Sequence, residues 1–105
     1  MRIAISHNKT KQEVMQIVDK SANDLFTMPL GAAQILDPQK RWDGNVMYFT
    51  FTGRQSIFKA TISGNIEVND KDLVINLELP GFLKNLIPEA QVRAAVEGKV
   101  RGLLT

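Results

Sequence analysis

Three consecutive segments of alternating apolar and polar residues constrain this chain more than any other feature. They cover residues 46–53, 56–68 and 73–79, and short turns separate them. A period of two residues sends successive side chains to opposite faces of a strand. Short turns make neighbouring strands pair antiparallel. The pattern therefore predicts an antiparallel sheet with one apolar face.

The same alternation assigns side chains to the two faces of the sheet. The apolar face is expected to carry Met47, Phe49, Phe51, Phe58, Ala60, Ile62, Ile66, Val68, Leu73, Ile75, Leu77 and Leu79. The opposite face is mostly polar, and its four apolar exceptions are Val46, Tyr48, Ile57 and Val74. We expect these four side chains to form the contact face of a homodimer, because they give the open face enough apolar character to pair with a second copy.

A predicted strand and a predicted helix precede these three strands. A short strand over residues 2–6 leads into Thr10-Lys-Gln-Glu13, which is the capping-box pattern of a helix start. Apolar residues then recur every three or four positions up to Phe26. Pro29 and Gly31 are expected to end this helix.

Two prolines restrict the segments around them. Pro38 lies in the less regular segment 34–42, which we place at a sheet edge or at a bulge because proline cannot donate to a central ladder. The second of three expected turns between strands lies at Gly53-Arg-Gln55. Pro80 ends the strand run, and apolar residues at helical spacing follow it along the final segment.

The predicted order is strand, helix, four strands, helix, in a single domain over residues 1–105. This order belongs to the α+β class, with a curved antiparallel sheet and helices on one face. It resembles the TATA-box-binding-protein-like and helix-grip folds, and this analogy concerns the fold alone.

Composition argues against several functional classes. Thirteen Lys and Arg against eleven Asp and Glu give a net charge of +2, and the basic residues are scattered, so nucleic acid is not an expected partner. The chain has no cysteine, which removes thiol catalysis and disulfides. No apolar run approaches the ~20 residues of a membrane span, and the first residues lack a signal-peptide pattern. We therefore expect a cytoplasmic protein without a transmembrane segment.

No convergent set of catalytic residues can be named. His7 is the single histidine, and a triad would need Ser6 as nucleophile with Asp37 or Asp43 as the acid. Adjacent strand residues point to opposite faces, so Ser6 and His7 are poorly placed to meet. We expect His7 to be a solvated side chain at a strand end, and we expect no enzyme activity and no cofactor.

A metal site is not expected either. Asp70 and Asp72 flank Lys71 in a turn, but a calcium loop needs further oxygen ligands at fixed spacing. Asn and Asp are favoured turn residues, so this segment is expected to be a solvated turn.

Two features could contact an apolar partner, and each has a packing alternative. The segment 82–87 either caps the core or presents an apolar patch, and Trp42 either covers the core edge or anchors a partner. The candidate apolar contact surface consists of Phe82, Leu83, Leu86, Ile87 and Trp42. A ligand between the sheet and the final helix would instead be lined by Phe49, Phe51, Phe58, Leu77 and Val96, although a filled core is the more ordinary outcome.

Several motifs together resemble one small family. They are Ile3-Ala-Ile-Ser-His7, Arg41-Trp-Asp-Gly-Asn45 with Met47-Tyr-Phe49, Ala60-Thr-Ile-Ser-Gly-Asn-Ile-Glu-Val68, Val74-Ile-Asn-Leu-Glu-Leu-Pro80 and Lys99-Val-Arg-Gly-Leu-Leu104. The pattern is similar to the polyhydroxyalkanoic acid system family, also called granule-region proteins, over roughly the full chain. The resemblance implies a small bacterial protein linked to polyhydroxyalkanoate granules or their metabolism, with no catalytic residues to carry over.

These observations lead to one main hypothesis and two alternatives. The main hypothesis is a small non-enzymatic accessory protein that contacts the polyester granule surface or granule proteins, in the cytoplasm or on storage granules. The first alternative is a binder of an apolar small molecule between the sheet and the C-terminal helix. The second is a dimeric structural or interaction module.

Overall fold

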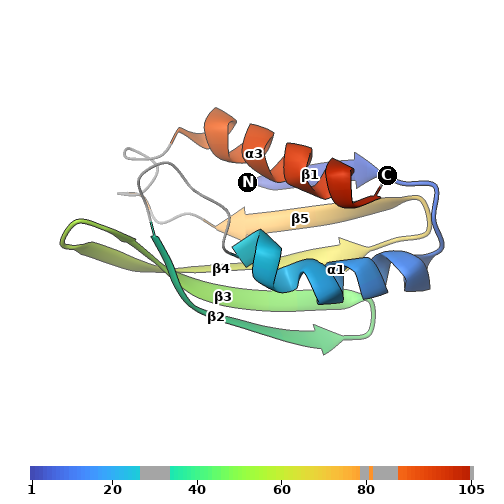
Figure 1. Cartoon of the computed structure of the whole chain (residues 1–105), viewed down its shortest axis with the longest axis horizontal. Helices are drawn as coiled ribbons and strands as arrows, with labels where there is room; N and C mark the ends of the chain where they lie inside the picture. The colour runs from blue at the N-terminus through green and yellow to red at the C-terminus, as the bar shows by residue number, and fades with distance from the viewer. Residues whose placement is uncertain (27–33, 79–80, 82–87, 105) are drawn as a thin grey trace.

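The computed structural model describes residues 1–26, 34–78, 81 and 88–104. Its elements are β1 (Arg2–Ser6), α1 (Lys11–Phe26), β2 (Gln34–Asp43), β3 (Val46–Gln55), β4 (Phe58–Val68), β5 (Asp72–Glu78) and α3 (Glu89–Leu104) (Figure 1). The predicted α+β class and the order strand, helix, four strands, helix are confirmed. Pro29, Gly31, Leu79 and Pro80 lie outside the described residues.

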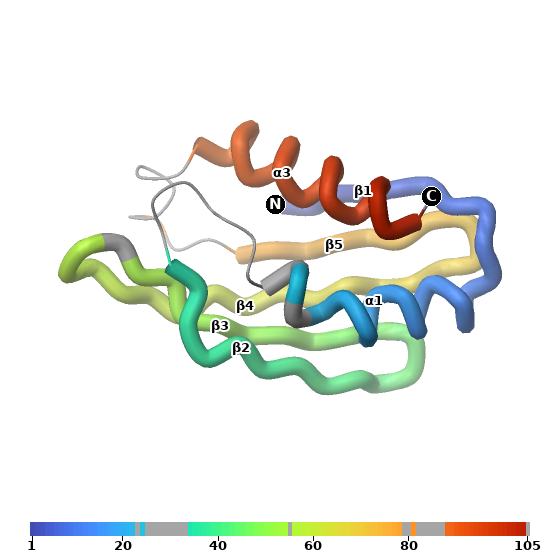
Figure 2. The backbone as a smooth tube through the Cα atoms, viewed as in Figure 1, coloured from blue at the N-terminus to red at the C-terminus, as the bar shows by residue number. Residues whose placement is uncertain are grey.

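The five strands form one antiparallel sheet in the order β1-β5-β4-β3-β2. Strands β2 to β5 follow one another across the sheet, and β1 pairs with β5 at the far side (Figure 2). β2 is therefore an edge strand, and its register shifts between Leu36 and Gln39, on either side of Pro38. Both the edge position and the bulge expected at this proline are confirmed.

Of the described elements, the helices α1 and α3 cover the same face of the sheet (Figure 1). Val14, Val18 and Ala22 recur every four residues on α1 and are buried, as are Val92 and Val100 on α3. The buried strand residues that meet them are Ile3, Ile5, Met47, Phe49, Phe51, Ile62, Ile66, Val68, Leu73, Ile75 and Leu77. Burial of each large aliphatic side chain contributes about 1.5–3 kcal/mol, so this layer supplies most of the driving force for folding.

Local hydrogen bonds explain where the helices begin. The backbone N–H of Glu13 donates to the Thr10 hydroxyl oxygen at 3.1 Å, and the N–H of Thr10 donates to the Glu13 carboxylate at 3.4 Å. These reciprocal bonds satisfy donors that the first helical turn leaves open, and they confirm the predicted capping box. At the other helix, the carbonyl of Pro88 accepts from the N–H of Val92 at 3.2 Å, directly before α3.

A glycine makes room for an aromatic ring on the core face. Gly64 of β4 pairs with Phe49 of β3 and with Leu77 of β5. A Cβ atom at Gly64 would lie 2.7 Å from Cζ of Phe49 and would also collide with the backbone oxygen of Asn76. The ring of Phe49 therefore occupies the space that a side chain at position 64 would need, and it stacks on Phe51 with ring centroids 6.1 Å apart.

The turn between β3 and β4 lies further along the chain than the sequence predicts. It consists of Ser56 and Ile57, and Gln55 pairs with Phe58 as the last rung of the ladder. The turn expected at Gly53-Arg-Gln55 is wrong, because those residues continue β3. The expected burial of Phe58 is wrong as well, since its side chain is 52% exposed.

Strand lengths explain this exposure. β5 pairs with β4 only over residues 63–68, and β2 begins at Gln34, which lies opposite Arg54. The last rungs of the β3–β4 hairpin therefore extend past the strands on either side. Figure 1 shows this end projecting from the sheet at the left.

Candidate functional site

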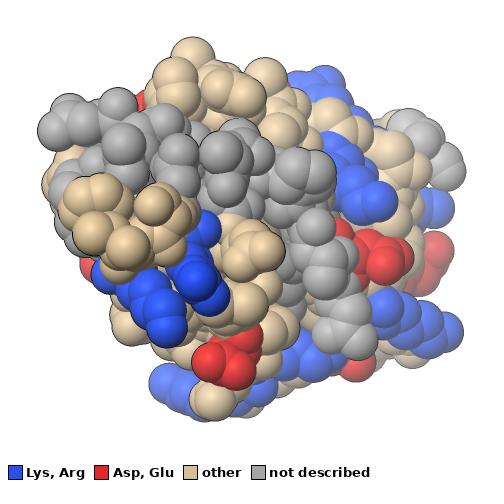
Figure 3. All heavy atoms as spheres, turned by 60° about the vertical axis from the view of Figure 1, so that its left-hand side comes forward, with Lys and Arg blue, Asp and Glu red and all other residues tan. Residues whose placement is uncertain are grey.

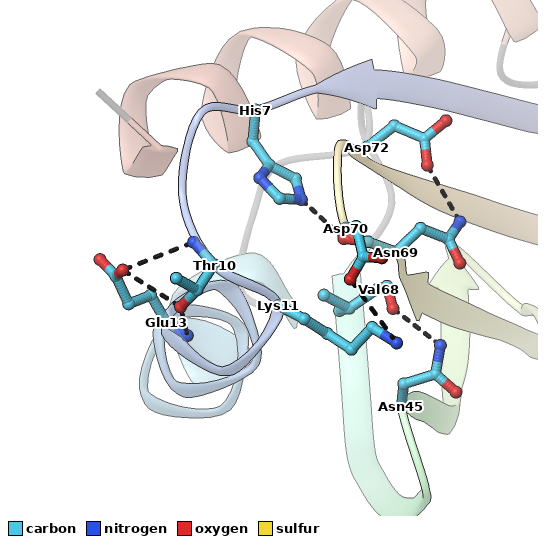
Figure 4. Close-up of polar contacts among 9 residues, drawn as sticks. All are labelled: His7, Thr10, Lys11, Glu13, Asn45, Val68, Asn69, Asp70 and Asp72. Atoms are coloured by element: carbon cyan, nitrogen blue, oxygen red, sulfur yellow. Dashed lines mark hydrogen bonds and ion pairs between the residues drawn. The ribbon is translucent and has the colours of Figure 1, made fainter.

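His7 follows β1 and is buried, with 8% of its surface exposed. Its Nε2 atom lies 2.9 Å from the carbonyl oxygen of Asn69 (Figure 4). The backbone N–H of Lys9 donates to Nδ1 at 3.2 Å. A carbonyl only accepts and an N–H only donates, so Nε2 carries the proton and Nδ1 is the acceptor. The neutral ring thus joins two loops, and the expectation of a solvated histidine is wrong.

The residues considered for a catalytic triad do not meet. Ser6 and His7 lie at the end of β1, which is one edge of the sheet, whereas Asp37 and Asp43 belong to β2 at the opposite edge. Four strand spacings of ~4.8 Å separate these edges, or about 19 Å. Both ring nitrogens of His7 are also engaged by backbone groups. This constellation therefore cannot perform nucleophilic catalysis.

The turn between β4 and β5 is held by hydrogen bonds within the chain. Asn69 donates from its side chain to the carboxylate of Asp72 at 3.0 Å, and Asn45 donates to the carbonyl of Val68 at 2.7 Å (Figure 4). The part of the chain that the structure describes contains no group of three or more acidic or histidine side chains that could hold a metal ion. Asp72 thus stabilises the turn itself, whereas Asp70 forms a long, exposed ion pair with Lys11 of α1 at 3.9 Å.

Trp42 fastens the edge strand to the first helix. It packs partly buried against the core, and its Nε1 donates to the Asp19 carboxylate at 2.9 Å. Lys40 binds the same carboxylate at 2.7 Å. These bonds, first the one from Lys40 and then the one from Trp42, hold the pKa of Asp19 below its ordinary value. Of the two alternatives for Trp42, the packing role fits this geometry.

The other four members of the candidate apolar contact surface lie outside the described residues. They are Phe82, Leu83, Leu86 and Ile87. Their role as a contact surface stays a prediction.

The four residues of the candidate dimer face do not form one exposed patch. Val74 is only 5% exposed, which is too little for a contact residue, and Val46 is half-buried. Tyr48 is 38% exposed, and the guanidinium of Arg41 lies 4.6 Å from the centroid of its ring. Ile57 lies nine residues further along the hairpin, about 30 Å away at ~3.3 Å per residue. A homodimer stays a prediction, but these residues together do not define its interface.

The residues proposed to line a ligand cavity do not surround a common space. Phe49, Phe51 and Leu77 are buried in the core, Val96 packs against it, and Phe58 lies at the exposed end of the hairpin. The structure does have a hollow of about 350 Å³ along β2 and β3. Its lining shares only Phe49 with the predicted set and consists of Gln39, Lys40, Arg41, Tyr48, Phe49 and Thr50.

The most exposed large apolar side chains of the described residues are adjacent in sequence. Ile57 is 87% exposed and Phe58 is 52% exposed. Both belong to residues 54–59, which we call the hairpin tip. Ser56 has a φ of 58°, a conformation that is unfavourable for a residue with a Cβ atom. Nε of Arg54 donates to the carbonyl of Ser56 at 3.3 Å and braces the turn.

The charged side chains within the hairpin tip are both basic. Arg54 and Lys59 lie directly opposite each other on β3 and β4, and both are exposed. No Asp or Glu occurs in the sequence between Asp43 and Glu67. The hairpin thus ends in an apolar pair flanked by two cations. Figure 3, in which this side of the molecule comes forward, shows basic side chains next to uncharged surface, with fewer acidic ones.

Comparison of the chain with protein-family models, curated proteins and solved structures finds no match to it. None of the helices in the described ranges is both long and apolar enough to cross a membrane. The hairpin tip is therefore the candidate functional site on the basis of its own geometry.

Sequence reasoning did not recognise the hairpin tip as a unit. It assigned Phe58 to the core and Ile57 to the dimer face, because the turn was placed two to three residues too early. A usable signal was present in the long stretch without acidic residues, since its two cations, Arg54 and Lys59, flank Ile57 and Phe58.

Proposed function

We propose that this protein is a non-enzymatic accessory protein that contacts the surface of polyhydroxyalkanoate granules. Two lines of support converge on it. The sequence motifs resemble the granule-region family, and the hairpin tip exposes two adjacent large apolar side chains, Ile57 and Phe58. Contiguous exposed apolar surface on a small protein is typical of an interaction site. The exposure of Ile57 and Phe58 at the hairpin tip is the single observation that carries the proposal.

The energy available from this contact suits reversible binding. Complete burial of one large apolar side chain contributes about 1.5–3 kcal/mol relative to exposure. Phe58 is already half covered, so the pair together supplies about 3 kcal/mol, which is on the order of a hundredfold in affinity. A protein held in this way would exchange between the granule surface and solution.

The test is co-sedimentation of the purified protein with polyester granules. The double variant Ile57→Ser with Phe58→Ser should lose most of the binding, by a factor on the order of a hundred. The matched control is Tyr48→Ser, which removes an exposed aromatic ring far from the hairpin tip and should leave binding intact. The proposal fails if the wild-type protein stays in the supernatant.

A further variant separates the hairpin tip from the other predicted contact. Leu83→Asp with Leu86→Asp alters the segment 82–87, which belongs to the candidate apolar contact surface predicted from the sequence. If binding is lost in this variant and kept in the hairpin-tip variant, the granule contact stands but the hairpin tip does not carry it. If all variants bind as the wild type does, neither region is the contact.

A further inference from the structure

We infer that the hairpin tip docks on an anionic phospholipid layer, with Ile57 and Phe58 entering the acyl boundary and Arg54 and Lys59 binding the headgroup phosphates. The inference deepens the proposed function and rests on the same contact site. It adds the chemistry of the surface, which the apolar pair alone does not specify.

The shape of the hairpin makes such docking possible. Gln55 and Phe58 form the last rung, and this rung lies beyond the pairing range of both neighbouring strands. The turn places Ile57 at the apex, where 87% of its surface is exposed. A planar surface that approaches this end of the sheet therefore meets the turn of the β3–β4 hairpin before the other strands (Figure 1).

Two opposed cations flank the apolar pair. Arg54 and Lys59 are directly opposite on antiparallel strands, and like charges in that position repel each other. An anion between them would remove this repulsion. Arg54 uses its Nε on the Ser56 carbonyl, and the remaining guanidinium N–H groups can bind a phosphate. On the adjacent strand β2, the acidic residue nearest in register to Arg54 is Asp37. It does not lie opposite Arg54, because Gln34 pairs with Arg54 and Leu36, the neighbour of Asp37, pairs with Thr52.

The order of these groups matches the depth profile of a lipid layer. The apolar side chains lie at the apex and the cations one rung behind, just as acyl chains lie inside the plane of the phosphates. Long basic side chains reach that plane while their carbon stems stay in apolar surroundings. Bare polyester offers no phosphate plane, and nucleic acid would call for a wider basic surface than two side chains.

The test uses vesicles of phosphatidylcholine alone or mixed with phosphatidylglycerol. Each cation near an anionic surface contributes about 1 kcal/mol, so the two together should favour the anionic vesicles by about thirtyfold. Arg54→Gln with Lys59→Gln should abolish this preference. Ile57→Ser with Phe58→Ser should weaken binding to both kinds of vesicle. Added salt should reduce the preference, because ions screen the attraction.

The matched control removes two cations elsewhere. Lys20→Gln with Lys99→Gln changes the net charge by the same amount at exposed helical positions and should keep the preference. If this control loses the preference as completely as Arg54→Gln with Lys59→Gln does, net charge and not the hairpin tip is responsible, and the inference fails. Far-UV circular dichroism confirms that each variant is folded.

The outcomes separate this inference from the proposed function. A wild-type protein that sediments with bare polyester granules but shows no preference for anionic vesicles overturns the lipid inference and leaves the proposed function in place. A protein that binds neither overturns both. Binding to anionic vesicles without binding to granules supports the lipid inference and overturns the granule assignment.

Discussion

The two ends of the β3–β4 hairpin use opposite chemistry. At the end near Asn45 and Val68, side-chain and backbone groups pair within the chain, and the buried ring of His7 joins the same group of loops. At the hairpin tip, Ile57 and Phe58 expose apolar surface and the flanking side chains are cationic. One end thus satisfies its own polar groups, and the other exposes apolar surface of Ile57 and Phe58.

The difference separates stability from binding. Buried polar groups must find partners, so the loops around His7 are expected to hold the fold together. The hairpin tip contributes little to the core, and its turn contains a serine at positive φ, where glycine or asparagine is more usual. Residues that cost stability without adding to the core are expected where a protein makes contacts.

The largest loss in the free energy of unfolding is expected from His7→Ala. The substitution leaves the Lys9 N–H and the Asn69 carbonyl without their partner, and an unsatisfied buried polar group costs about 1–3 kcal/mol. Urea unfolding at neutral pH should show this loss in the free energy of unfolding. Asn8→Ala, at the exposed neighbouring position, is the control and should change little. If His7→Ala is as stable as the wild type, the loops around His7 do not hold the fold together as expected.

A somewhat smaller effect is expected from Thr10→Ala. Loss of a capping hydroxyl costs about 1 kcal/mol, because the Glu13 N–H then lacks its acceptor. A thermal melt followed by circular dichroism should show a lower Tm. Gln12→Ala alters an exposed position in the same helical turn and should not lower the Tm.

A weaker, pH-dependent effect is expected at Asp19. Its pKa is lowered in the folded state by Lys40 and Trp42, so the stabilisation is present above its ordinary pKa and is lost as the pH falls through the lowered value. Asp19→Asn should therefore be less stable than wild type at neutral pH, and the two should converge in acid. The carboxylate is half exposed, which keeps the difference small.

The single tryptophan makes this prediction easy to follow. Trp42 is the only one in the chain and donates to Asp19, so its fluorescence reports the unfolding transition at each pH. A difference between the two proteins that persists unchanged into strong acid would contradict the assigned role of this carboxylate.

The smallest effect on stability is expected at the hairpin tip. Ile57→Ser with Phe58→Ser should change the free energy of unfolding by no more than about 0.5 kcal/mol per site, which is the usual range for exposed positions. The same variant should lose granule binding. If it is instead destabilised as much as His7→Ala, the hairpin tip is part of the folding core and the contrast between the two ends disappears.

Much of the fold followed from local patterns. The alternation in 46–51 placed Met47, Phe49 and Phe51 on the buried face, and Pro38 marked both an edge strand and a bulge. These signals work because side-chain direction and proline geometry depend only on the backbone next to them. The candidate site was not predicted as a unit, since its turn was placed too early.

The sequence by itself determined that β2, β3, β4 and β5 each pair antiparallel with the next strand, which face they bury and where the first helix begins, because these properties arise from neighbours in the chain. The pairing of β1 with β5 joins residues 2–6 to residues 72–76, and the tertiary structure decided it. Only the tertiary structure decided the environment of His7, the covering of Val74 and the exposure of Phe58. Each of these depends on distant segments: the Asn69 loop that meets His7, the strands that flank Val74 and the points where β2 and β5 stop. The hairpin tip is exposed because the adjacent strands β2 and β5 stop short of it. No pattern within residues 54–59 predicts where those two strands stop.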